Sequence, residues 1–186
     1  MWSIRVKQQE IDWRLSSTTR ILQALSDGLK DVGRDFDEAH EDYQIDDALE
    51  HAESLLGIAF VTAQAYMAGT ISDANQLIEA GGRLTKEQLI KDYSDHLAES
   101  VVTKVELCDA IANYFKHHDE WSSWSMTGRN QKTVSILRAA GIQENDEFPC
   151  RKATDLLWSN NNGSDLQPLL SLITSWREAV ITACKR

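Results

Sequence analysis

The sequence predicts an all-α fold, a single bundle of six or seven helices formed by residues 1–186. Proline occurs twice and glycine nine times, while Ala, Leu, Glu, Gln and Lys fill long stretches, so local propensity favours helix nearly throughout. Apolar residues recur at three- and four-residue intervals, and no segment shows a convincing strand alternation. With 42 % hydrophobic residues, a chain of this length can bury a substantial core in one domain.

The first two helices are predicted at residues 8–29 and 41–68. The first is loosened or ended by Gly28 and Gly33, and its apolar stripe consists of Ile11, Leu15, Leu22, Leu25 and Leu29. The second has an acidic, exposed start and a last part that is apolar on nearly every side, and Gly69 ends it. Its stripe consists of Ile45, Leu49, Ala52, Leu56, Ala59, Phe60, Ala63 and Met67.

A short third helix is expected at residues 72–80. Either Ser72 or Asp73 can cap its start, and Gly81-Gly82 makes the clearest turn in the chain.

A long helix follows this turn. Thr85 and Gln88 form a capping box at its start, and roughly eight turns of helix bring it to an end near His117 or His118. We assign one apolar face of this helix to the core, formed by Ile90, Leu97, Val101, Val105, Cys108, Ala112 and Phe115.

Three shorter helices complete the predicted bundle. The first two are expected at residues 130–140, where a glycine closes the helix, and at residues 151–158. In the closing helix, Ser164 and Gln167 form a capping box and Pro168 lies in the first turn, where its missing N–H is tolerated. The stripe of this helix consists of Leu166, Leu169, Leu170, Ile173, Trp176 and Val180.

Acidic residues are concentrated in one segment. Eleven of the 27 residues in the range 27–53 are Asp or Glu and two are basic, so this segment carries a charge of −9 out of −10 for the chain. Such a block repels nucleic acid and anionic lipid and attracts basic protein surfaces, although a solvated helix face is the alternative explanation. We predict a basic protein partner whose contacts are Asp35, Asp37, Glu38, Glu41, Asp42, Asp46, Asp47, Glu50 and Glu53, the last four of the nine being turned toward solvent on the second helix.

Residues 120–131 are the best candidate for an ordered functional loop, with a plain connection between helices as the alternative. Trp121 and Trp124 lie there among serines, and an exposed Trp is a favoured interface anchor. We therefore add both to the predicted partner contacts, while noting that either can instead fold back over the end of the core.

The sequence contains no nucleotide-binding loop and no nucleophile triad, so it predicts neither an enzyme nor a cofactor. The N-terminus has no apolar signal region, and no stretch approaches the roughly 20 uncharged apolar residues of a membrane span, which predicts a cytoplasmic protein. Cys108, Cys150 and Cys184 are widely spaced and odd in number, so we expect free thiols, with Cys108 in the core.

Histidines lie close to acidic residues at two places in the sequence. Asp47 and His51 are four residues apart, but neither a zinc nor a calcium motif is present, and we predict no metal site. His117 and His118 adjoin Lys116, two acids and aromatics, a set that suits acid–base chemistry. The favoured alternative is that Lys116 and a His satisfy the carbonyls at the end of the helix.

Residues 112–121, ANYFKHHDEW, in their helical setting resemble bacterial HEPN-like proteins, which include ribonucleases and inactive relatives. These ribonucleases carry an Arg followed four to six residues later by a His, and Arg34 and His40 fit that spacing here. The resemblance implies a ribonuclease or an inactive antitoxin. However, Arg34 and His40 lie inside the acidic segment, where RNA phosphate would be repelled.

A second resemblance agrees better with the charge. Residues 55–73, LLGIAFVTAQAYMAGTISD, and residues 109–121 resemble helical immunity proteins of bacterial contact-dependent growth inhibition. That resemblance implies a non-enzymatic inhibitor that neutralises a basic nuclease toxin without binding nucleic acid or membrane. The third possibility is an adaptor whose acidic residues serve solubility, and the oligomeric state is left open.

Overall fold

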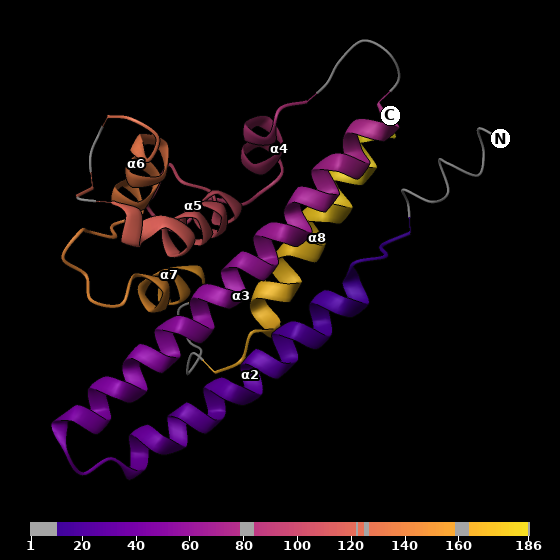
Figure 1. Cartoon of the computed structure of the whole chain (residues 1–186). Coiled ribbons are helices and arrows are strands. Elements are labelled where there is room, and N and C mark those ends of the chain that lie inside the picture. Colours follow the sequence, from indigo (N-terminus) through magenta and orange to yellow (C-terminus); the bar gives the residue numbers. More distant parts are fainter. Residues whose placement is uncertain (1–10, 79–83, 122, 125–126, 159–163, 186) are drawn as a thin grey trace.

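The computed structural model describes residues 11–78, 84–121, 123–124, 127–158 and 164–185. Within them it contains α-helices and one short 3-10 helix but no strand, which confirms the all-α prediction (Figure 1). The elements are α2 (Leu15–Glu38), α3 (Asp42–Leu77), α4 (Lys86–Asp92), α5 (Lys104–His117), η1 (His118–Glu120), α6 (Gln131–Ala139), α7 (Pro149–Leu157) and α8 (Gln167–Cys184).

Helices α2 and α3 form a long antiparallel hairpin, and α3 is the central helix of the molecule (Figure 1). It packs against α2, α5, α7 and α8. Helix α8 covers only the part of the hairpin nearer the chain ends. The backbone N–H of Leu166, just before α8, donates to Ser26 Oγ at 3.0 Å, which fixes the start of α8 against the middle of α2. The last three turns of α2 and the start of α3 therefore extend beyond α8.

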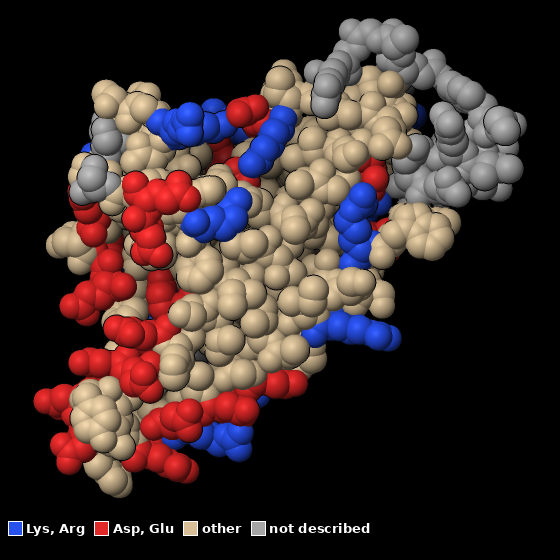
Figure 2. All heavy atoms as spheres, viewed as in Figure 1, with Lys and Arg blue, Asp and Glu red and all other residues tan. Residues whose placement is uncertain are grey.

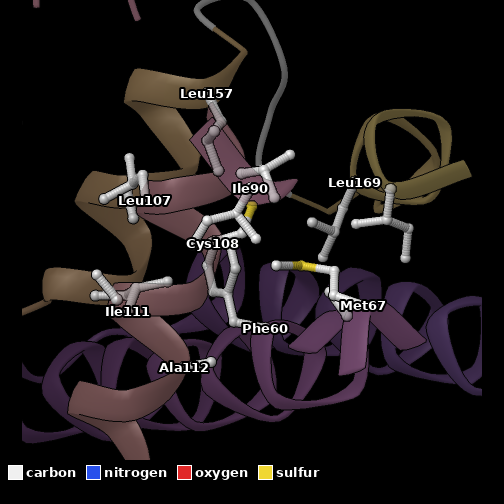
Figure 3. Close-up of a cluster of buried hydrophobic side chains, with 14 of the residues drawn as sticks. Phe60, Met67, Ile90, Leu107, Cys108, Ile111, Ala112, Leu157 and Leu169 are labelled. Atoms are coloured by element: carbon white, nitrogen blue, oxygen red, sulfur yellow. The ribbon is translucent and has the colours of Figure 1, made fainter. Parts of the chain in front are cut away.

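The core lies where α3, α4, α5, α7 and α8 meet. Figure 3 shows side chains from these helices converging on one cluster, including Phe60 and Met67 of α3, Ile90 of α4 and Leu169 of α8. Cys108 lies in the same cluster and is fully buried, as predicted. Burial raises the pKa of its thiol, so it stays protonated and packs as a small apolar side chain.

Helix α2 differs from the prediction at both ends. It begins at Leu15, and it continues through Gly28 and Gly33 to Glu38, nine residues beyond the predicted end. The prediction that these two glycines end the helix is wrong. Gly28 lies against Leu55 of α3, so packing between the two helices maintains the helical conformation that local propensity alone would weaken.

Helix α3 also runs further than predicted. It continues through Gly69 to Leu77, so the expected end at Gly69 and the short helix capped by Ser72 or Asp73 are both wrong. Gly69 instead allows the Arg14 side chain to lie close to the backbone of α3, because a Cβ at this position would clash with that side chain. Asp73 lies in the middle of the charge network that Arg14 joins. The predicted turn at Gly81-Gly82 lies outside the described residues.

By length and composition alone, α3 is also apolar enough to qualify as a candidate membrane span, which the sequence analysis did not expect. The core helix of a soluble protein passes the same test. In this fold the helix packs against four others.

The predicted eight-turn helix is in fact two helices, α4 and α5. The capping box at the start of α4 is confirmed, with Gln88 N–H donating to Thr85 Oγ1 at 3.2 Å. A second capping box, between Thr103 and Glu106, starts α5 after an irregular connection. This break shifts the register, so Val101, predicted in the core, is 78 % exposed.

The C-terminal helices agree more closely with the prediction. Gly141 closes α6 with a φ of +90°. Pro168 lies in the first turn of α8, and all six residues of the predicted stripe are buried. The predicted capping box is wrong: Gln167 N–H bonds Asp165 Oδ1 at 2.9 Å, and the helix begins after Leu166.

Gly33 and Gly57 provide a paired test of this packing. A Cβ at Gly33 would meet no atom within 4 Å, whereas one at Gly57 would clash with the Phe115 ring of α5. We expect Gly33→Ala to raise the free energy of unfolding by about 0.5–1 kcal/mol, because alanine favours helix. Gly57→Ala should lower it by about 1–3 kcal/mol through overpacking. Urea unfolding checks both, and equal stabilities for the two variants would contradict the described contact.

Candidate partner-binding surface

The acidic residues gather at the distal end of the α2–α3 hairpin (Figure 2). Helix α2 ends at Glu38 and α3 begins at Asp42, so only a short turn separates the two acidic helix ends. The Gln44 side-chain oxygen accepts the backbone N–H groups of His40 and Glu41, at 2.9 and 3.1 Å, and thereby fixes the turn. We call the following eight exposed carboxylates the acidic tip: Asp35, Asp37, Glu38, Glu41, Asp42, Asp46, Asp47 and Glu50.

The two basic residues of the segment are paired before the tip begins. Lys30 Nζ lies 2.9 Å from Asp27 Oδ1, and this hydrogen bond lowers the pKa of Asp27. Arg34 pairs with Asp31 one turn further on. Within the described part of the chain, no Lys or Arg forms an ion pair with any of the eight tip carboxylates. The negative charge of the tip is therefore not neutralised within the fold.

Glu53 does not belong to this exposed set, and its predicted orientation toward solvent is wrong. Its two carboxylate oxygens accept the backbone N–H groups of Cys150 at 2.6 Å and Arg151 at 3.0 Å. These are the first free amides of α7, so Glu53 caps that helix from α3. Burial and the nearby carboxylate together raise the pKa of the Cys150 thiol.

Two exposed aromatic side chains lie among the acids, and sequence analysis did not assign them to the site. Tyr43 is 70 % exposed and Phe36 is 43 % exposed. Phe36 stands between two aspartates in the sequence and belongs to no predicted apolar stripe. This combination is a sequence signal for an exposed aromatic side chain. Aromatic side chains are frequent anchors in protein interfaces, so the tip combines charge with apolar contact area.

A groove of about 520 Å³ lies between the distal half of α2, the start of α3 and α7. Its walls carry Lys30, Arg34, Asp37, Arg151 and Asp155, and its apolar lining comes mainly from Leu29, Val32, Phe36, Leu49, Ala52 and Leu56. The hairpin thus presents carboxylates and an apolar groove at the same end.

The predicted Trp pair lies elsewhere, beside α5 and α6. Trp124 is only 7 % exposed, and its ring contacts Tyr114 edge-on at a centroid distance of 5.5 Å. Its backbone N–H bonds Glu144 Oε1 at 2.9 Å. The prediction of an exposed anchor is therefore wrong for Trp124, which folds back over the core. Trp121 is half-buried and also packs edge-on against Tyr114.

The histidines at the end of α5 make local contacts. His118 Nδ1 lies 3.1 Å from the Phe115 carbonyl oxygen, as expected for a residue that satisfies a helix end. His117 Nδ1 lies 3.2 Å from Glu120. Contrary to the prediction, Lys116 Nζ donates to the side-chain oxygen Oε1 of Gln64 at 2.6 Å and not to a backbone carbonyl at the end of α5.

His117 also lines a second cavity, of about 410 Å³, beside α4, α5 and α6. The charges around it are largely paired with one another. Lys86 lies 2.6 Å from Asp109, and Lys132 lies 2.6 Å from Glu87, whose pKa this hydrogen bond lowers. This pairing leaves less unbalanced charge here than at the acidic tip.

The remaining candidates lie around the acidic tip. His51 Nδ1 stands 3.8 Å from Asp47 Oδ2, and no group of three potential metal ligands is found in the described ranges. Arg34 pairs with Asp31, while His40 lies in the turn after α2. Comparisons of the chain with protein-family models, curated proteins and solved structures gave no match.

Proposed function

We propose that the protein is a non-enzymatic inhibitor that binds a basic protein through the acidic tip, and that this partner is a nuclease toxin. The observation that carries the proposal is the set of eight exposed carboxylates without a Lys or Arg partner in the described structure. Like charges within one helix turn destabilise the helix by a few tenths of a kcal/mol per pair. A cationic partner would remove that repulsion.

A nuclease surface fits this chemistry because it must neutralise nucleic-acid phosphates with Lys and Arg. The same basic side chains can bind the carboxylates of the tip, which would block access of the nucleic acid. Complementary charge would also steer the two proteins together and make association fast at low salt.

The test reverses charge at the tip with Asp46→Lys, Asp47→Lys and Glu50→Lys in one variant. Glu53 is left unchanged because it caps α7. The control variant reverses three exposed acids away from the tip, Asp92, Asp95 and Glu178, and has the same net charge. Association with a basic nuclease domain encoded beside this gene is then measured by surface plasmon resonance at low and high salt.

We expect the tip variant to associate at least about tenfold more slowly at low salt, with a weaker salt dependence. The control variant should lose much less, because its charges lie away from the tip. Unchanged association kinetics of the tip variant at both salt concentrations would contradict the proposal.

A further inference from the structure

The groove beside the acidic tip is a continuation of the site that α8 occupies. Helix α8 packs against α2 and α3 and begins where the Leu166 N–H donates to Ser26 Oγ. Beyond Ser26, α2 continues for 12 residues to Glu38, a length of about 18 Å at 1.5 Å per residue. The groove of about 520 Å³ lies along this extension.

Helix α8 shows what kind of segment the α2–α3 hairpin accepts. Its buried side chains follow helical spacing and include Leu169, Ile173, Trp176 and Val180. The distal groove is lined by apolar side chains of the same two helices, among them Val32 and Phe36. Phe36 remains 43 % exposed there, so apolar surface is available for a further helix.

The charged side chains around the groove determine which sign of charge an occupant should carry on its polar face. Of the basic residues on its walls, Lys30 and Arg34 are paired with aspartates of α2. Arg151 and Asp155 of α7 oppose each other in sign, and Asp37 belongs to the acidic tip. Beyond these pairs, the walls carry the charge of Asp37, which adds to that of the adjoining acidic tip and favours a basic occupant.

We infer that the distal groove binds a basic amphipathic helix of the partner, placed end to end with α8. Such a helix has apolar residues at positions i, i+3 or i+4, and i+7, with Lys or Arg on either side, and three of its turns match the extension of α2. This inference rests on the proposed function and specifies how the partner is held.

The probe is a synthetic peptide, LKKLLKLLKKLLKL, with a fluorescent label at its N-terminus. Its control has the same composition in an order that lacks an apolar stripe. Binding to the full-length chain is measured by fluorescence anisotropy at several salt concentrations. We expect the amphipathic peptide to bind at least about tenfold more tightly than the control peptide.

Phe36→Asp distinguishes binding in the apolar groove from binding by charge attraction alone, because it removes apolar surface while adding a negative charge. Ile21→Asp is the matched control, since Ile21 is 45 % exposed on α2 but does not line the groove. We expect Phe36→Asp to weaken peptide binding about tenfold and Ile21→Asp to leave it equal or slightly stronger.

A second variant, Gly33→Trp, fills the groove. Gly33 lines the groove, and a Cβ there meets no atom within 4 Å, so the substitution places an indole at the groove wall without a clash at the Cβ. Ser54→Trp, on an exposed position of α3, is its control. We expect Gly33→Trp to abolish binding of the amphipathic peptide and Ser54→Trp to retain it, with equal helicity of both variants by circular dichroism.

Unchanged or tighter binding by Phe36→Asp would overturn the groove inference while leaving the acidic tip as a binding surface. Equal binding of the two peptides would also overturn it. Sedimentation that shows a dimer of the wild-type chain and a monomer of Gly33→Trp would assign the groove to a second copy and equally refute the inference. A failure of the proposed function gives a different result from a failure of the groove inference. If the proposed function is wrong, the variant with reversed charges at the acidic tip binds its partner normally.

Discussion

Ile173→Asp is expected to prevent folding, whereas Val101→Asp should yield a stable, helical protein. Ile173 is fully buried in the face of α8, so the substitution would place a carboxylate without a partner in the core. Burying an uncompensated charge costs several kcal/mol, a large part of the about 5–15 kcal/mol that stabilises a domain. Val101 is 78 % exposed, and its carboxylate would remain in water.

Soluble expression and thermal unfolding followed by circular dichroism distinguish the two variants. A well-folded Ile173→Asp protein would show that α8 does not pack as described. Loss of folding in Val101→Asp would show that the break between α4 and α5 is wrong.

Asp73→Ala is expected to lower the free energy of unfolding by about 3 kcal/mol, because it breaks a buried charge network. Asp73 is 9 % exposed, and its Oδ2 accepts from Arg14 at 2.8 Å and from Arg177 at 2.9 Å. Arg177 is 5 % exposed and also lies 3.3 Å from Asp12. Without Asp73, this buried guanidinium would keep Asp12 as its only carboxylate among the described ion pairs.

Urea unfolding measures the effect, with Asp46→Ala as the control. Asp46 is exposed at the acidic tip, and its removal should change the free energy of unfolding by no more than about 0.5 kcal/mol. Equal stability of the two variants would mean that the network does not hold α2, α3 and α8 together. Tyr66, whose hydroxyl donates to Asp12, also belongs to this network, and burial raises its pKa.

Periodicity predicted the helices well wherever an apolar stripe faced one neighbour. The stripe of α8 is the best example, because every predicted member is buried. Glycine was the main source of error. Gly28 and Gly69 lie inside helices, where their contacts with Leu55 and Arg14 accompany a helical conformation despite a local preference of about 1 kcal/mol against it.

The residues of the candidate site were harder to predict because several depend on contacts with residues far away in the sequence. Glu53 is separated by 97 residues from Cys150, whose backbone it caps, and no local pattern marks such a contact. Trp124 lies in an irregular segment, where periodicity cannot distinguish an exposed ring from a buried one. The exposed acids of the tip were easier, because their local excess of charge cannot be accommodated in a core.

Because α8 begins only beside the middle of α2, the distal part of the hairpin can vary more freely in sequence. Substitutions beyond Ser26 on α2, and in the facing turns of α3, alter few of the side chains that fill the core. Under the proposed function, sequence drift in that part of the hairpin is constrained mainly by the partner, while the rest of the bundle stays constrained by folding. Residues 31–47 contain none of the side chains of the core cluster, so they can be replaced without redesign of the remaining chain, whereas Glu53 is needed to cap α7.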